Sequence, residues 1–114
     1  KSVKKVLVLG VAYKKDTGDT RESPALDVIR LRQEQGAIVS FHDPYSNAIR
    51  GEDGRMEKGV ALTQRNLNAA DLVVIVTDHA VFDYGMIVKN ARRILDTRNA
   101  TRNVKGGRGK IVKL

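Results

Sequence analysis

The sequence contains no cysteine and few aromatic residues. Its 114 residues include no Cys and no Trp, and aromatic residues make up 4% of the total. The lack of cysteine excludes disulfides, thiolate metal sites and a cysteine nucleophile within this chain. The scarcity of aromatic side chains leaves few platforms on which the bases of a single-stranded nucleic acid could stack.

The sequence also has no long hydrophobic run, and it has no acidic residue near its C-terminus. No apolar run approaches the roughly 18 residues that span a bilayer, and residue 1 leads straight into a strand pattern rather than a signal peptide. We therefore expect no membrane association, and a cytoplasmic location is the default. The net charge of +8 would attract polyanions of several kinds. The last acid is Asp96, and the simplest interpretation of the basic end is a solvated tail containing Arg98, Arg102, Lys105, Arg108, Lys110 and Lys113.

Strand and helix patterns alternate along the chain, whose length fits a single domain over residues 1–114. Strands are expected at residues 6–11, 37–41, 72–76 and 93–96. Helices are expected to start at Ser23, Thr63 and Asp78, with Gly36 ending the first. The alternation predicts an α/β fold with three layers, a Rossmann-like parallel sheet covered by helices on both faces.

The remaining segments give weaker signals. Residues 45–59 are polar and contain the turn signal Asp53-Gly54, which predicts an exposed loop or a small hairpin. Residues 99–109 have the composition of an irregular segment, and residues 110–114 could add an edge strand.

Residues 10–24 (GVAYKKDTGDTRESP) follow directly after the first strand. Ligands of parallel α/β sheets bind beyond the carboxyl ends of the strands. A diphosphate could bridge cations there, with amides near Ser23 adding positive potential. The loop lacks the later glycines of the dinucleotide motif and has no GK pair followed by Ser or Thr, so side chains would bind the phosphates. The residues expected at this rim are Lys14, Lys15, Asp43, Thr77, Asp78 and Arg98.

Each predicted cation, and also Tyr13, has a simpler interpretation that involves no ligand. Lys14 and Lys15 could be solvated loop residues. Arg21 could pair with a neighbouring acid and brace the loop, and the same alternative applies to Arg98. Tyr13 could contact a base or sugar, or it could be a half-buried aromatic at the strand end.

Acidic and histidine residues offer no separate catalytic or metal site. The acids Asp16, Asp19 and Glu22 lack the spacing of a calcium loop, so we expect structural or interdomain ion pairs and no metal. His42 and His79 each adjoin an Asp, but no serine stands at a strand-to-helix elbow. We expect both histidines to brace turns or cap helices.

Four motifs, in order, resemble the C-terminal domain of the UDP-glucose/GDP-mannose dehydrogenase family, and the resemblance spans nearly the whole chain. They are GVAYKKDTGDTRESPALDVIRL, FHDPY, LVVIVTDHAVF and ILDTRN. The resemblance implies an enzyme that oxidises the C6 alcohol of a nucleotide sugar to a carboxylate with NAD, through a thioester on a cysteine. Since this chain has no cysteine, it is expected to be inactive alone.

The resemblance also implies partners and residue roles. A separate NAD-binding domain and a central dimerisation domain would complete a homo-oligomeric enzyme. Tyr13, Lys14 and, more weakly, Lys15 resemble the residues that meet a UDP-sugar. Arg98 resembles the arginine that closes the nucleotide pocket, and Arg21 resembles the arginine that reaches toward NAD. The residues that make up these motifs favour UDP-glucose or UDP-N-acetylhexosamine as the substrate.

Two other classes of function remain open. A small basic module could bind nucleic acid through the C-terminal third, although nucleic acid is the less favoured partner. It would show steep salt dependence. The chain could instead be a structural module whose charged loop docks on a neighbour.

Overall fold

The computed structural model describes residues 5–11, 33–45, 48–50 and 56–113. The strands are β1 (Lys5–Leu9), β2 (Ile38–His42), β3 (Ala48–Arg50), β4 (Met56–Lys58), β5 (Leu72–Ile75), β6 (Ile94–Asp96) and β7 (Ile111–Lys113). The helices are α2 (Gln64–Ala69), α3 (Tyr84–Asn90) and the short 3-10 helix η1 (Arg108–Lys110). Among these residues, no helix is long and apolar enough to cross a membrane.

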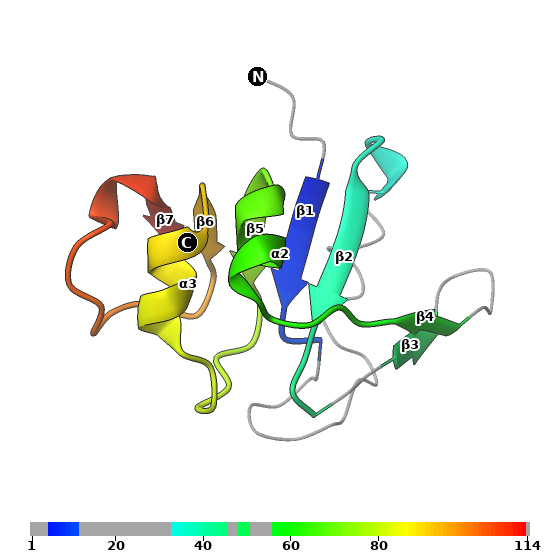
Figure 1. The fold of residues 1–114 in the computed structure, drawn as a ribbon, viewed down its shortest axis with the longest axis horizontal. Coiled ribbons are helices and arrows are strands. Elements are labelled where there is room, and N and C mark those ends of the chain that lie inside the picture. Colours follow the sequence, from blue (N-terminus) through cyan, green and yellow to red (C-terminus); the bar gives the residue numbers. More distant parts are fainter. Residues whose placement is uncertain (1–4, 12–32, 46–47, 51–55, 114) are drawn as a thin grey trace.

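Five strands form one sheet in the order β2-β1-β5-β6-β7, and every neighbouring pair is parallel (Figure 1). β1 pairs with β2 on one side and with β5 on the other, so the chain changes direction across the sheet between β1 and β5. Ligands of open α/β sheets bind at such a switch point, beyond the carboxyl ends of the strands. The predicted parallel α/β fold is confirmed.

The two faces of the sheet have separate cores. Helices α2 and α3 cover one face, where Leu9, Leu67 and Ile87 are fully buried together (Figure 1). The opposite face carries a second cluster that includes Val8 and Val74. This division follows from strand alternation, because neighbouring residues of a strand point to opposite faces.

The helix predicted from Ser23 lies outside the described residues except at its end. Residues 33–34 are helical. The amide of Gly36 donates to the carbonyl of Gln33 at 3.0 Å, and Gly36 has a φ of +89°. The predicted left-handed glycine at the end of this helix is therefore confirmed.

Three further predictions of local structure are confirmed. β3 and β4 pair antiparallel as a small hairpin within residues 45–59. Thr63 caps α2, because its hydroxyl oxygen accepts a hydrogen bond from the amide of Asn66 at 3.1 Å. β7 adds an edge strand next to β6.

The predicted start of the next helix at Asp78 is wrong. α3 begins at Tyr84, and its cap is Asp83, five residues after Asp78. The Asp83 carboxylate accepts from the amide of Met86 at 3.1 Å. The intervening residues cannot join the helix because His79 and Phe82 are buried in the turn that precedes it. Asp78 is thereby left at the carboxyl end of β5, where it contacts Arg98.

Candidate functional site

The predicted site residues divide into two groups. Asp43, Thr77, Asp78 and Arg98 follow the carboxyl ends of β2, β5 and β6, as the parallel sheet requires. Tyr13, Lys14, Lys15 and Arg21 lie in residues 12–32, outside the described residues. Their assignment to substrate or NAD stays a prediction.

Arg98 lies in a turn organised by the buried carboxylate of Asp96. One oxygen of Asp96 accepts from the amides of Arg98 at 3.1 Å and Ala100 at 2.9 Å. The other accepts from the amide of Thr101 at 2.9 Å and from its hydroxyl at 2.6 Å. Asn99 adopts a left-handed φ of 56°, which asparagine tolerates better than most residues. A single side chain thus fixes the backbone of the turn that carries Arg98.

These hydrogen bonds also determine the ionisation of Asp96. Burial by itself would raise the pKa of Asp96, because a charged carboxylate is poorly stabilised away from water. The bonds from Thr101, Ala100 and Arg98 favour the charged form and outweigh burial, so the pKa is held below its usual value of 3.8. Asp96 therefore carries a full negative charge at neutral pH.

The guanidinium group of Arg98 lies partly in solvent, beside Asp78. Arg98 Nη2 is 3.5 Å from Asp78 Oδ1, and the two side chains are 45% and 18% exposed. This Asp78 oxygen is buried and, within the described part of the chain, makes no hydrogen bond. Asp78 also lines a hollow of about 240 Å³ together with Tyr84, Ala100 and Arg102. A guanidinium group that is 45% exposed can donate hydrogen bonds to an anionic ligand.

The exits of β1 and β5 meet at Gly10. A Cβ atom at this position would lie 2.7 Å from Thr77 Cβ and 2.9 Å from the Thr77 backbone nitrogen and oxygen. Gly10 also has a φ of +88°. The glycine therefore permits close approach of two backbones at the switch point, which explains its presence without a dinucleotide motif.

Asp43 connects three segments at the same edge. One carboxylate oxygen accepts from the amide of Val11 at 2.8 Å and lies 2.9 Å from His79 Nε2. The other oxygen accepts from the amide of Tyr45 at 2.8 Å. The predicted turn-bracing role of His79 is confirmed. His42 braces as well, since its Nδ1 lies 2.8 Å from the carbonyl oxygen of Val60.

The basic C-terminal segment is less solvated than predicted. Lys110 Nζ donates to the carbonyl oxygens of Val88 at 2.7 Å and Ala91 at 2.8 Å, at the carboxyl end of α3. The side chain of Lys110 is partly buried, whereas Arg102 and Lys105 are exposed. The prediction of a solvated tail is thus wrong for Lys110, because the α3 carbonyls need donors that no further helical turn supplies.

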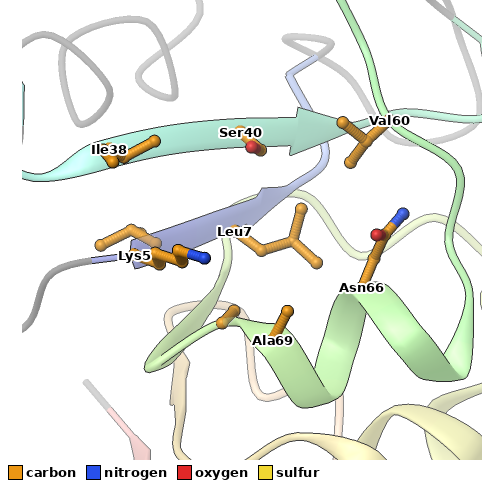
Figure 2. Close-up of a pocket in the computed structure, with 9 residues that line it drawn as sticks. Lys5, Leu7, Ile38, Ser40, Val60, Asn66 and Ala69 are labelled. Atoms are coloured by element: carbon orange, nitrogen blue, oxygen red, sulfur yellow. The ribbon is translucent and has the colours of Figure 1, made fainter.

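A second cavity, of about 230 Å³, lies between α2 and the strands β1 and β2 (Figure 2). Its lining includes Lys5 and Ile38, the first residues of β1 and β2, and the apolar side chains of Leu7 and Val60. It therefore opens near the amino ends of these strands, away from Arg98 and Asp43. Its mostly apolar lining does not suit a diphosphate.

The sequence pattern does not predict that Asp96 and Asp43 organise the edge. The strand pattern predicts Asp96 only as the last residue of a strand. However, an aspartate at a strand end, followed by a Thr-Arg-Asn turn, is a signal for hydrogen bonds from backbone amides to the side chain. Asp43 was placed at the rim, but its contact with His79 joins residues 36 positions apart. No local pattern predicts such a contact.

Sequence comparison matches this chain to one family of enzymes. Residues 7–103 match the model of the UDP-glucose/GDP-mannose dehydrogenase family, UDP binding domain. The UDP-N-acetyl-D-mannosamine dehydrogenase of Pyrococcus horikoshii is 38% identical over 99 residues, which cover 82% of this chain and 21% of that protein. The UDP-glucose 6-dehydrogenase of Gallus gallus is 32% identical over 118 residues, covering 82% of this chain and 24% of that protein.

Solved structures show the same fold. The UDP-N-acetyl-mannosamine dehydrogenase of S. aureus superposes with a TM-score of 0.74 at 26% identity, over 99% of this chain and 27% of that one. The Pyrococcus horikoshii UDP-D-ManNAc dehydrogenase gives 0.71 at 28% identity, over 98% of this chain and 25% of that one. The chain spans about a quarter of the length of these relatives. It belongs to the UDP-glucose/GDP-mannose dehydrogenase family, as a UDP binding domain.

Proposed function

We propose that this chain binds the nucleotide end of a UDP-sugar within an NAD-dependent UDP-sugar 6-dehydrogenase. The whole of residues 1–114 is assigned to this domain. The NAD-binding and central dimerisation domains lie outside the chain, in an enzyme that assembles as a homo-oligomer. The product is a uronate for polysaccharide synthesis, made in the cytoplasm.

The observation that carries the proposal is the placement of Arg98. Its backbone is fixed by Asp96 at the carboxyl edge of a parallel sheet. Its guanidinium group lies 3.5 Å from Asp78, which is one of the residues that line the hollow. A planar group with several donors suits the oxygens of a phosphate or ribose. Tyr13, Lys14 and Lys15 are the other residues of this chain proposed to contact the substrate.

The domain contributes binding rather than chemistry. Holding the UDP end, remote from the C6 alcohol, would orient the sugar toward reacting groups in the rest of the enzyme. NAD supplies the hydride acceptor when bound, and Arg21 is the residue of this chain proposed to face it. Relatives named for UDP-glucose and for UDP-N-acetyl-mannosamine match this chain, so a UDP-sugar is the proposed substrate class.

Titration calorimetry of the 114-residue chain with UDP tests the proposal. We expect measurable binding, and we expect Arg98→Gln to weaken it by about tenfold, as for one charge-assisted hydrogen bond. Arg92→Gln is a matched control because it removes the same charge from a 63% exposed side chain that precedes β6, at the opposite end of the strand. This control should leave the affinity unchanged.

Two results would count against the proposal. Equal losses in Arg98→Gln and Arg92→Gln would indicate a response to net charge rather than a site. Binding of an RNA oligonucleotide that exceeds UDP binding and falls steeply with salt would support the nucleic-acid alternative instead.

A further inference from the structure

Within the described part of the chain, donors from three residues converge on the buried carboxylate of Asp43. The side chains of Asp43 and His79 are both fully buried. The amides of Val11 and Tyr45 and the ring nitrogen Nε2 of His79 lie between 2.8 and 2.9 Å from the two carboxylate oxygens. A carboxylate can only accept, so the proton of the His79 ring lies on Nε2 and points at Asp43.

The three donors come from three different exits of the sheet. Val11 follows β1, Tyr45 follows β2 and His79 follows β5. These segments are far apart in sequence, with separations of 32 residues between Val11 and Asp43 and 36 between Asp43 and His79. The contact therefore fixes the exits of β1, β2 and β5 relative to one another.

Aromatic residues enclose the His79 side of this contact. The His79 ring lies 5.0 Å from the ring of Tyr45 and 5.4 Å from that of Phe82, centroid to centroid. The Tyr84 hydroxyl donates to the His79 carbonyl oxygen at 2.8 Å. Low local polarity strengthens hydrogen bonds and makes an unpaired donor costly.

In the sequence, the contact adjoins both groups of residues that are proposed to bind the substrate. His79 directly follows Asp78, which pairs with Arg98 at 3.5 Å. On the other side, Val11 precedes Tyr13 and Lys14 by two and three residues in the sequence. A shift of Val11 relative to His79 would therefore change the proposed spacing between Lys14 and Arg98.

We propose that Asp43 and His79 are positioning residues that set the spacing between the β1 exit and the Asp78–Arg98 pair, and through it the affinity for a nucleoside diphosphate. This inference rests on the proposed function for its effect on binding. The geometric part, fixation of Val11 and Tyr45 by Asp43, stands without it.

An asparagine has the shape of an aspartate but cannot replace Asp43. If its oxygen faces Val11 and His79, its NH₂ group faces the amide of Tyr45, so two donors meet. If it is turned around, the NH₂ group meets the amide of Val11 instead. Asp43→Asn thus breaks the contact without changing the size of the side chain.

The test uses the full 114-residue chain with Asp43→Asn, and UDP as the probe. We expect the amides of Val11 and Tyr45 to exchange with solvent about tenfold faster, and the affinity for UDP to fall about tenfold, as for one hydrogen bond to a charged group. Exchange of Val73 and Ile75, inside β5, should change much less. Circular dichroism verifies that the variant is folded.

Two variants separate positioning from general destabilisation. Ile94→Val removes one methylene group from a buried side chain of β6 and should leave Val11 exchange and UDP affinity at wild-type values. His79→Phe keeps a ring against Tyr45 and Phe82 but removes the donor, so it should reproduce part of the Asp43→Asn effect. If Asp43→Asn does not fold, amide exchange and UDP affinity measured on His79→Phe test the proposal instead.

The outcomes separate this inference from the proposed function. Wild-type exchange at Val11 and Tyr45, or a uniform acceleration that Ile94→Val also produces, overturns the positioning role. Local acceleration with unchanged UDP affinity overturns its link to binding. If the wild-type chain binds no UDP, the proposed function fails, and the exchange measurements alone decide whether Asp43 fixes the strand exits.

Discussion

We expect Asp96→Asn to destabilise the chain by about 2 to 4 kcal/mol, although the substitution keeps the size of the side chain. The carboxylate accepts four hydrogen bonds, two on each oxygen. An asparagine oxygen can keep the amides of Arg98 and Ala100, now without the charge. Its NH₂ group then meets the amide of Thr101, a buried donor that loses its acceptor, while the Thr101 hydroxyl can rotate to accept.

Urea unfolding followed by far-UV circular dichroism measures this change, since the chain has no Trp for fluorescence. A loss of this size would lower the melting temperature by roughly 10 °C in a domain of about a hundred residues. Asp71→Asn is the matched control. Asp71 is 34% exposed, lies 3.6 Å from Arg92 and accepts from the amide of Lys5 at 2.9 Å.

The control substitution should cost less than about 1 kcal/mol, because water can replace the lost contacts of a partly exposed carboxylate. The reasoning fails if Asp96→Asn and Asp71→Asn unfold at the same urea concentration. That result would mean that water or a shifted backbone satisfies the donors of the turn as well as Asp96 does.

The structure supports three more predictions. Lowering the pH should destabilise the wild-type chain, because the folded pKa of Asp96 lies below the unfolded value of 3.8. The stabilisation by the carboxylate is complete well above 3.8 and is lost as the pH falls through the folded pKa. Urea midpoints should show a gap to Asp96→Asn that is constant down to about pH 5 and shrinks below about pH 4, and a gap that stays constant at the lower pH contradicts this. Gly10→Ala should cost about 2 to 5 kcal/mol, from positive φ and the clash with Thr77. Gly36→Ala, with a similar φ of +89° and nothing within 4 Å, should cost only about 1 to 2 kcal/mol in the same urea assay, and equal costs would exclude the clash. Lys110→Met should lower the melting temperature by several degrees, because two carbonyls at the end of α3 lose their donor; an unchanged melting temperature would show that water replaces it.

The sequence predicted the sheet well because parallel strands depend on short apolar runs. Residues 72–76 are continuously apolar, and β5 lies in the centre of the sheet as such a run requires. Caps were also predictable where one residue acts on the adjoining turn, through its hydroxyl at Thr63 and through its positive φ at Gly36. These signals are local, so no knowledge of the tertiary fold is needed to interpret them.

The start of α3 shows where local signals fail. Asp78 and Asp83 both have the side chain of a helix cap, and each precedes residues that can form a helix. Burial of His79 against Asp43 decides between them, because a helix starting at Asp78 would have to rebuild that contact. The Asp43 contact depends on strand order, which the sequence does not state.

The Arg98–Asp78 pair limits what Arg98 alone can contribute to binding. Asp78 lies within ion-pair distance and offsets the positive charge of Arg98 locally. A diphosphate approaching Arg98 would therefore also be repelled by the Asp78 carboxylate, so Arg98 provides directed donors but little net attraction. The attraction must come from further cations at the same edge, and Lys14 and Lys15 are the residues proposed for it. The proposed cations Lys14 and Lys15 follow β1, whereas the donors of Arg98 follow β6. Because Asp43 fixes the exit of β1, we expect it to affect the affinity for UDP.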